Sequence, residues 1–158
     1  MKNQALSMLI QRLIVGTAML LLVAAFAFSQ DAGKNPIQSE AGPIRSSPAY
    51  SEILLRKTEL QADLEAFSVD YTEANPKIAD LRFELGALDK ELEKVFAVRP
   101  TETAKLTLAL GKLIVRKAEL ETDYNRLSRS YNKDHPEVKR TKRKVEIFDA
   151  AIREILGK

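Results

Sequence analysis

The side chains that could do chemistry in this 158-residue chain are few. There is one histidine, His135, and no cysteine, which excludes thiol nucleophiles, disulfides, cysteine-ligated zinc, iron–sulfur sites and a histidine metal cage. Acidic pairs such as Glu59 with Asp63 and Glu91 with Glu93 could act as acid and base only in a cleft that separates their pKa values. No metal-ligand spacing, glycine-rich loop or nucleophile motif accompanies them. The sequence therefore predicts neither an enzyme nor a bound cofactor.

A dense basic segment occupies residues 139–144. Such a segment can bind an anionic membrane surface or an anionic polysaccharide. Helical spacing, however, spreads these side chains around more than half of the circumference, which suits a face that pairs with acidic residues of the same protein. Both interpretations stay open, and the basic side chains are Lys139, Arg140, Lys142, Arg143 and Lys144.

The elements that position these residues are repeated along the chain. Residues 50–98 align without a gap with residues 110–158, at a constant offset of 60. Nine of the 49 aligned positions are identical, whereas a chain of this composition gives about three by chance. We therefore expect two copies of one unit. The identical positions are Arg56/Arg116, Lys57/Lys117, Glu59/Glu119, Leu60/Leu120, Asp63/Asp123, Ser68/Ser128, Tyr71/Tyr131, Pro76/Pro136 and Asp89/Asp149.

Apolar residues recur in each unit at alternating steps of three and four, which predicts a seam between helices that pack lengthwise. Lys57 and Lys117 interrupt this seam at the same position of the two copies. We expect their stems to lie along the seam and their ammonium groups to reach water or acids such as Glu91, Glu93 and Glu154.

Prolines mark the turns between the predicted helices. A capping side chain, Asn75 in one unit and His135 in the other, precedes a proline that is tolerated in the first helical turn. A tyrosine stands four residues before each capping residue and is expected to cover the hairpin end. The predicted turn residues are Tyr71, Asn75, Pro76, Tyr131, His135 and Pro136.

The predicted fold is all-α. Because the connections are short, consecutive helices should run antiparallel, as two tandem helical hairpins in a four-helix bundle or an elongated coiled coil. The first hairpin covers residues 51–98 and the second covers residues 99–158. We predict the four helices at 51–71, 76–98, 102–131 and 136–156.

The two hairpins carry opposite charge. The first holds 6 basic and 11 acidic residues, a net charge of −5, and the second holds 15 basic and 9 acidic residues, a net charge of +6. Matched positions exchange sign, as in Asp80/Arg140 and Glu84/Lys144. Exposed ion pairs each contribute about 0–1 kcal/mol, so they select a partner more than they stabilise it. We expect the hairpins to dock on each other, within one chain or across a dimer, with the basic segment facing these acids.

The N-terminus predicts export. Residues 13–28 form a run without charge, and Ala27 and Ser29 provide the small residues of a signal-peptide cleavage site, so we expect cutting after Ser29. The run is shorter than the roughly 20 apolar residues that span a bilayer. Residues 1–29 are therefore predicted to be a signal peptide, with a retained N-terminal membrane anchor as the alternative. Both place the rest of the chain outside the cytoplasm, periplasmic or secreted, which excludes nucleic acid as a partner.

Residues 30–50 are rich in glycine, proline and serine and poor in apolar side chains. This composition predicts a flexible linker between the N-terminal segment and the first hairpin.

The two turn segments share a pattern: Tyr, three residues, Asn or His, Pro, one residue, then Ile or Val, as in residues 71–78 and 131–138. Placed between two heptad helices, it resembles the extracytoplasmic coiled-coil hairpins of polysaccharide chain-length determinant and exopolysaccharide-export proteins. The sequence shows neither the second transmembrane segment, nor the cytoplasmic tyrosine-kinase domain, nor the membrane-proximal α/β domain of that family. The resemblance therefore implies hairpin geometry and an envelope setting, without a role in polymer length control.

These features predict a non-enzymatic coiled-coil protein of the cell envelope. Its expected role is a structural or protein-interaction module that binds partner proteins or itself through its helices, near polysaccharide-export or secretion machinery. One alternative is a periplasmic holding chaperone for unfolded clients. The other is a binder of anionic membrane or polysaccharide surfaces through residues 139–144.

Overall fold

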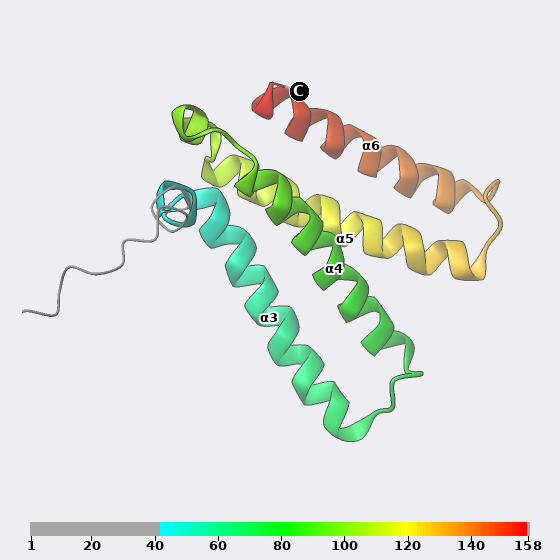
Figure 1. Ribbon diagram of the computed structural model, residues 1–158. Helices are drawn as coiled ribbons and strands as arrows, with labels where there is room; N and C mark the ends of the chain where they lie inside the picture. Colours follow the sequence, from blue (N-terminus) through cyan, green and yellow to red (C-terminus); the bar gives the residue numbers. More distant parts are fainter. Residues whose placement is uncertain (1–41, 158) are drawn as a thin grey trace, which may run out of the picture. The chain divides into compact units, whose positions relative to one another are not determined.

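The computed structural model describes residues 42–157, and all regular secondary structure in this part of the chain is helical. The predicted all-α fold is confirmed. The predicted signal peptide or anchor, and the linker up to residue 41, lie outside the described residues. The long helices are α3 (Pro48–Asp70), α4 (Pro76–Phe96), α5 (Leu108–Ser130) and α6 (Pro136–Leu156), with a 3₁₀-helix, η2 (Pro100–Lys105), between the second and third (Figure 1).

Side-chain caps begin all four long helices. The hydroxyl of Ser47 accepts a hydrogen bond from the backbone N–H of Tyr50 at 3.2 Å, and that of Thr107 accepts from Leu110 at 3.3 Å. Such bonds satisfy backbone donors that have no partner inside the helix. Helices α3, α4 and α6 also have proline in the first turn, and α6 ends at a left-handed glycine, Gly157 (φ 72°).

The helix bounds repeat at the offset of 60 residues. Helix α5 begins and ends 60 residues after α3, and α6 begins and ends 60 residues after α4. The caps repeat too, because Ser47 corresponds to Thr107 and Asn75 to His135. The internal repeat of the sequence is therefore also a repeat of structure.

Two predicted boundaries are wrong. Residues 42–50 are not linker: residues 42–45 are helical, α3 begins at Pro48, and Ile44 and Ala49 are buried in the core. The helix expected at 102–131 begins only at Leu108, because the buried Leu106 interrupts it and its carbonyl oxygen accepts a hydrogen bond from the backbone N–H of Ala49 at 3.2 Å.

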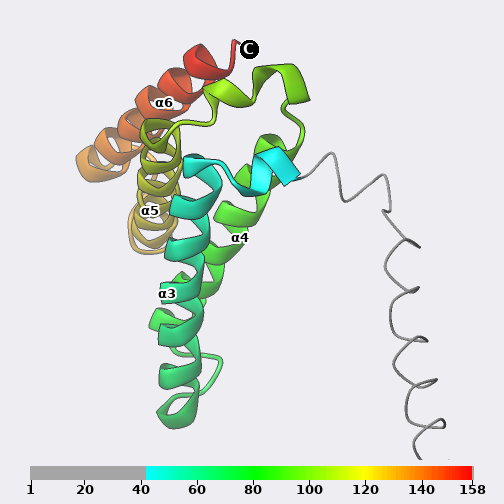
Figure 2. The same cartoon turned by 90° about the vertical axis from the view of Figure 1, so that its left-hand side faces the viewer.

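Helix α5 is the central element of the described residues. It packs against α3, α4 and α6, whereas α6 packs chiefly on α5. Helices α3 and α4 form one antiparallel hairpin and α5 and α6 the other. The hairpins converge where α3 begins and α6 ends. From there they diverge, so that their turns at 71–75 and 131–135 lie far from each other (Figures 1 and 2).

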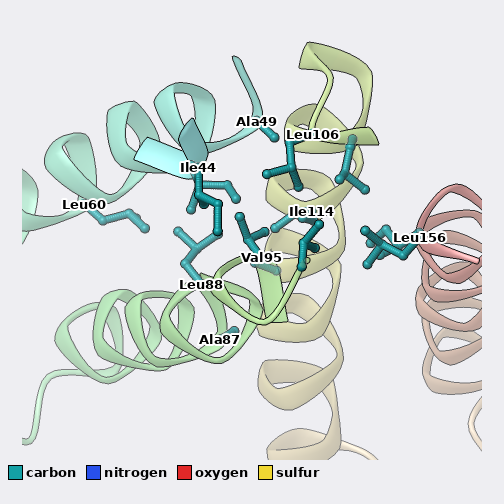
Figure 3. Packing of buried hydrophobic residues seen from close by; sticks show 14 of the residues in the cluster. Ile44, Ala49, Leu60, Ala87, Leu88, Val95, Leu106, Ile114 and Leu156 are labelled. Atoms are coloured by element: carbon teal, nitrogen blue, oxygen red, sulfur yellow. The ribbon is translucent and has the colours of Figure 1, made fainter. Parts of the chain in front are cut away.

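The core lies where the hairpins converge (Figure 3). Gly111 lets α5 approach α3 closely, because a Cβ atom there would lie 2.8 Å from Cβ of Glu52 and 2.9 Å from Cα of Ala49. Within residues 42–157 no helix has the length and hydropathy needed to cross a membrane. The buried core comprises Ile44, Ala49, Ile53, Leu60, Leu81, Ala87, Leu88, Val95, Val98, Leu106, Leu110, Ile114, Ala118, Ile152 and Leu156.

Candidate functional site

The turn residues act locally. The Asn75 side chain accepts a hydrogen bond from the backbone N–H of Lys77 at 2.8 Å, and Nδ1 of His135 accepts from Glu137 at 3.3 Å. The Tyr131 ring stacks on His135 with centroids 4.2 Å apart, while Tyr71 packs on Phe67 at 5.8 Å. Pro76 and Pro136 each stand in the first helical turn. Since the two turns lie apart, they do not form a common site.

Lys117 is the centre of a buried ion-pair network. Its side chain is only 6% exposed, and its ammonium group lies 2.6 Å from Oε1 of Glu91 on α4 and 2.8 Å from Oδ1 of Asp149 on α6. Lys94 reaches the same Oε1 of Glu91 at 2.7 Å. The network therefore joins three helices, α4, α5 and α6.

The equivalent lysine of the first hairpin makes the equivalent pair. Lys57 donates to Asp89, 60 residues before the Lys117–Asp149 pair, so both partners are identical in the repeat. This pair is more exposed. Of the three acids expected from the sequence, only Glu91 binds a seam lysine. Glu93 and Glu154 are exposed, and Asp89 and Asp149 pair with the two lysines instead.

The network perturbs two titrating groups. Burial by itself lowers the pKa of Lys117, but its hydrogen bonds to Asp149 and Glu91 outweigh burial and raise it above the ordinary value. The hydrogen bond from Lys117 also lowers the pKa of Asp149. Both groups therefore stay charged over the physiological pH range.

Glu91 also lines a groove. The groove has a volume of about 490 Å³ and lies between α4 and α6 over α5. The Oε2 atom of Glu91 is buried and has no hydrogen-bond partner among residues 42–157, although Oε1 has two lysines. Apolar and aromatic side chains form walls, and lysines and acids line the rest: Phe83, Ala87, Tyr124, Val145, Lys90, Lys94, Lys117, Lys142, Glu121 and Glu146.

Sequence reasoning did not find this groove. It named Glu91 as one of an acidic pair with Glu93 and as an acid within reach of a seam lysine. The one available signal was that Glu91 corresponds to Ala151 in the other copy, so an acid stands in one repeat where the other has a small apolar residue.

Within one chain the basic segment does not face Asp80 and Glu84 of the acidic hairpin, so the prediction is wrong for docking inside a single chain. Asp80 pairs with Arg129, and Glu84 lies 2.7 Å from Arg56. Helix α5 rather than α6 packs on this part of α4, so α5 supplies the cation for Asp80. The described ion pairs of the basic segment are local: Lys139 with Asp134, Arg140 with Glu137, and Arg143 with Glu146; Lys142 lines the groove and Lys144 is exposed.

No cluster of three or more His, Cys, Asp or Glu side chains that could hold a metal ion occurs in the described part of the chain. Comparison with known proteins adds no assignment: no protein-family model, curated protein or solved structure matches the chain.

Proposed function

We propose that the chain is a non-enzymatic protein-interaction module of the cell envelope, which binds a helical segment of a partner protein in the groove between α4 and α6. The observation that carries this proposal is that Glu91 lines the groove and that its buried Oε2 atom has no hydrogen-bond partner among the described residues. A buried carboxylate oxygen without a donor costs about 1–3 kcal/mol, and a bound partner can supply the donor.

The lining of the groove defines the chemistry of the partner. Phe83, Ala87, Tyr124 and Val145 favour apolar side chains spaced along one face of a helix. One basic or amide side chain of the partner would donate to Oε2 of Glu91. The lysines of the groove favour acidic residues at the edges of the bound segment.

A peptide selection tests this proposal. A displayed library of amphipathic helical peptides is selected on the full chain, and the bound peptides are compared with those selected on Glu91→Leu and on the exposed control Glu93→Leu. We expect enriched peptides with an apolar i, i+3, i+4 stripe and one basic or amide residue, and loss of that polar preference only with Glu91→Leu. Equal preference with both variants, or no enrichment, contradicts the proposal.

The envelope location rests on the N-terminal sequence. The intact mass of the chain recovered from fractionated cells tests it. A product that begins at Gln30 in the soluble extracytoplasmic fraction supports a cleaved signal peptide, and a full-length product in the membrane fraction supports an anchor. Recovery of the full-length chain from the cytoplasm contradicts export.

A second candidate function is binding to an anionic surface, because the side chains of Arg140 and Arg143 are 69% and 73% exposed and pair only locally among the described residues. Binding to vesicles that contain an anionic lipid should then fall steeply with salt and be lost when Arg140, Arg143 and Lys144 are replaced by glutamate. Unchanged binding by that variant would exclude this candidate.

A further inference from the structure

The two hairpins dock on each other inside the chain through a face of α5 that has a recognisable order of side-chain sizes. Helix α5 presents to the first hairpin a face of alternating small and large residues, all of them buried. Cross-hairpin ion pairs border it, and one of these joins Arg56 to Glu119 at 3.8 Å. This face comprises Leu110, Gly111, Ile114, Ala118 and Thr122; Lys117 and Leu120 are the other buried residues of α5.

The repeat places the same pattern on α3, where all of its residues but Tyr50 are exposed; Tyr50 is half-buried against the ring of Phe96. The positions 60 residues earlier have the same order of small and large side chains. Ile114 is 1% exposed, but its counterpart Leu54 is 45% exposed, and the adjacent Leu55 is 57% exposed. We call this the α3 outer face: Tyr50, Ser51, Leu54, Leu55, Thr58 and Ala62.

The second hairpin carries a counterpart of the surface on which α5 docks. On the first hairpin that surface includes Glu52 and Arg56 of α3 and Asp80, Glu84 and Ala87 of α4. The matched residues of the second hairpin are exposed, with Ile147 55% exposed among four basic side chains. We call this the basic outer face: Lys112, Arg116, Arg140, Lys144 and Ile147.

Charge makes the two outer faces complementary. The hairpin that bears the α3 outer face has a net charge of −5, and Glu59 and Asp63 lie on the same helix; the hairpin that bears the basic outer face has a net charge of +6. The Arg56–Glu119 pair also has its counterpart, because Arg116 and Glu59 are the identical residues of the repeat. An Arg116–Glu59 pair between two copies would repeat a contact already made inside one chain.

We propose that the chain docks head to tail on a second copy of itself, with the α3 outer face of one copy against the basic outer face of the next. This contact continues the internal repeat from chain to chain and uses surfaces distinct from the groove. The two surfaces of such an interface differ, so each added copy leaves one surface free for the next and the assembly grows with concentration. One position departs from the internal contact: Ser51 stands where Gly111 allows close approach, so the helices of two copies lie farther apart there.

Two variants, each blocked on one face, test the proposal in the full chain. Leu54→Glu with Leu55→Glu blocks the α3 outer face, and Arg140→Glu with Lys144→Glu blocks the basic outer face. All of these residues are exposed, and circular dichroism checks that the variants fold. Lys133→Glu with Arg153→Glu makes the same change of net charge away from that face and serves as the control.

Sedimentation velocity over a range of concentrations provides the measurement. We expect the unmodified chain and the control to form larger species as concentration rises, each blocked variant to stay monomeric, and their equimolar mixture to form a dimer of twice the 17.7 kDa chain mass and nothing larger. The dimer should weaken as salt rises and tighten when Ser51→Gly is added to the variant that keeps its α3 outer face.

Other outcomes overturn the proposal. An unmodified chain that is monomeric at every concentration excludes self-docking. If the basic outer face of such a chain binds anionic vesicles, the anionic-surface function replaces the self-docking proposal. Dimers of either blocked variant alone show a symmetric contact instead. A mixture that stays monomeric shows that the two faces do not bind each other.

Discussion

At the scale of residues, the repeat keeps an ion pair but changes its surroundings. Lys57 and Asp89 in the first hairpin correspond to Lys117 and Asp149 in the second. The first lysine is half-buried and its aspartate is exposed, whereas the second lysine is buried under α4, whose buried Glu91 is an additional partner. The same two residues therefore form a surface pair in one hairpin and part of a buried network in the other.

This difference predicts unequal effects of one substitution. Lys117→Met should lower the free energy of unfolding by about 3 kcal/mol, because it removes a cation from a buried carboxylate. Lys57→Met should lower it by less than about 1 kcal/mol, because its pair is exposed. Urea unfolding of the two variants measures both values. Adding Glu91→Leu to Lys117→Met should restore most of the loss, and equal losses for the two single variants would contradict the buried network.

The same network predicts the pH dependence of stability. The folded-state pKa of Asp149 lies below its ordinary 3.8, so its contribution is present above pH 3.8 and is lost as pH falls through the folded-state pKa. The pKa of Lys117 lies above its ordinary 10.5, so its contribution is complete below pH 10.5 and is lost only as pH rises through the folded-state pKa.

Urea unfolding at a series of pH values checks this expectation. Between these limits neither group should change the free energy of unfolding. Asp149→Asn should reduce the dependence on pH below 3.8, with the exposed Asp134→Asn as the control. An unchanged acid-side dependence in Asp149→Asn would show that the Lys117 contact does not form.

Local residue chemistry could be predicted from the sequence, and the groove could not. The caps at Asn75 and His135 depend only on neighbouring residues, so their positions are visible in a short stretch of sequence. The unpartnered Oε2 of Glu91 depends on how three helices meet. No sequence spacing encodes that arrangement.

At the scale of elements, the prolines and the apolar seam predicted the four helices and their antiparallel hairpins, and both prediction errors fall where the chain turns. One buried residue, Leu106, is enough to end η2 and start α5 later than predicted. Likewise, two buried apolar side chains, Ile44 and Ala49, hold a segment rich in serine and proline on the core. Average composition does not detect a single buried side chain.

Two helical glycines give a test of packing between elements. Gly111→Ala places a Cβ atom 2.8–3.0 Å from Glu52 and Ala49, so it should lower the free energy of unfolding by about 1–3 kcal/mol. Gly86→Ala meets nothing within 4 Å and should raise it by up to about 1 kcal/mol, the usual gain from alanine in a helix. Thermal unfolding compares the two variants. Stabilisation by both would mean that α5 does not approach α3 as closely as described.

At the scale of the whole molecule, charge predicted that the hairpins dock, but it assigned the contacts to the wrong helix. The acids of α4 meet basic residues of α5, such as Lys117 and Arg129. Arg140 and Lys144, the basic residues of α6 that match Asp80 and Glu84, are left exposed. The exchange of charge sign between the repeats therefore makes the α3 outer face and the basic outer face different in charge. Which helices contact each other inside the chain depends instead on how the two hairpins cross.

This arrangement predicts a gradient of local stability. Helix α5 is covered by three helices, and α6 chiefly by one, so opening of α6 exposes less apolar surface than opening of α5. Amide hydrogen exchange of the variant blocked on its basic outer face, which we expect to be monomeric, should be slowest in α5 and fastest among the long helices in α6. Ile152→Ala, which weakens the contact of α6 with the core, should speed exchange in α6 and leave α3 unchanged. Equal protection of α5 and α6 would mean that a second surface covers α6 in the monomer, and the chain would then close on itself rather than present its basic face to another copy.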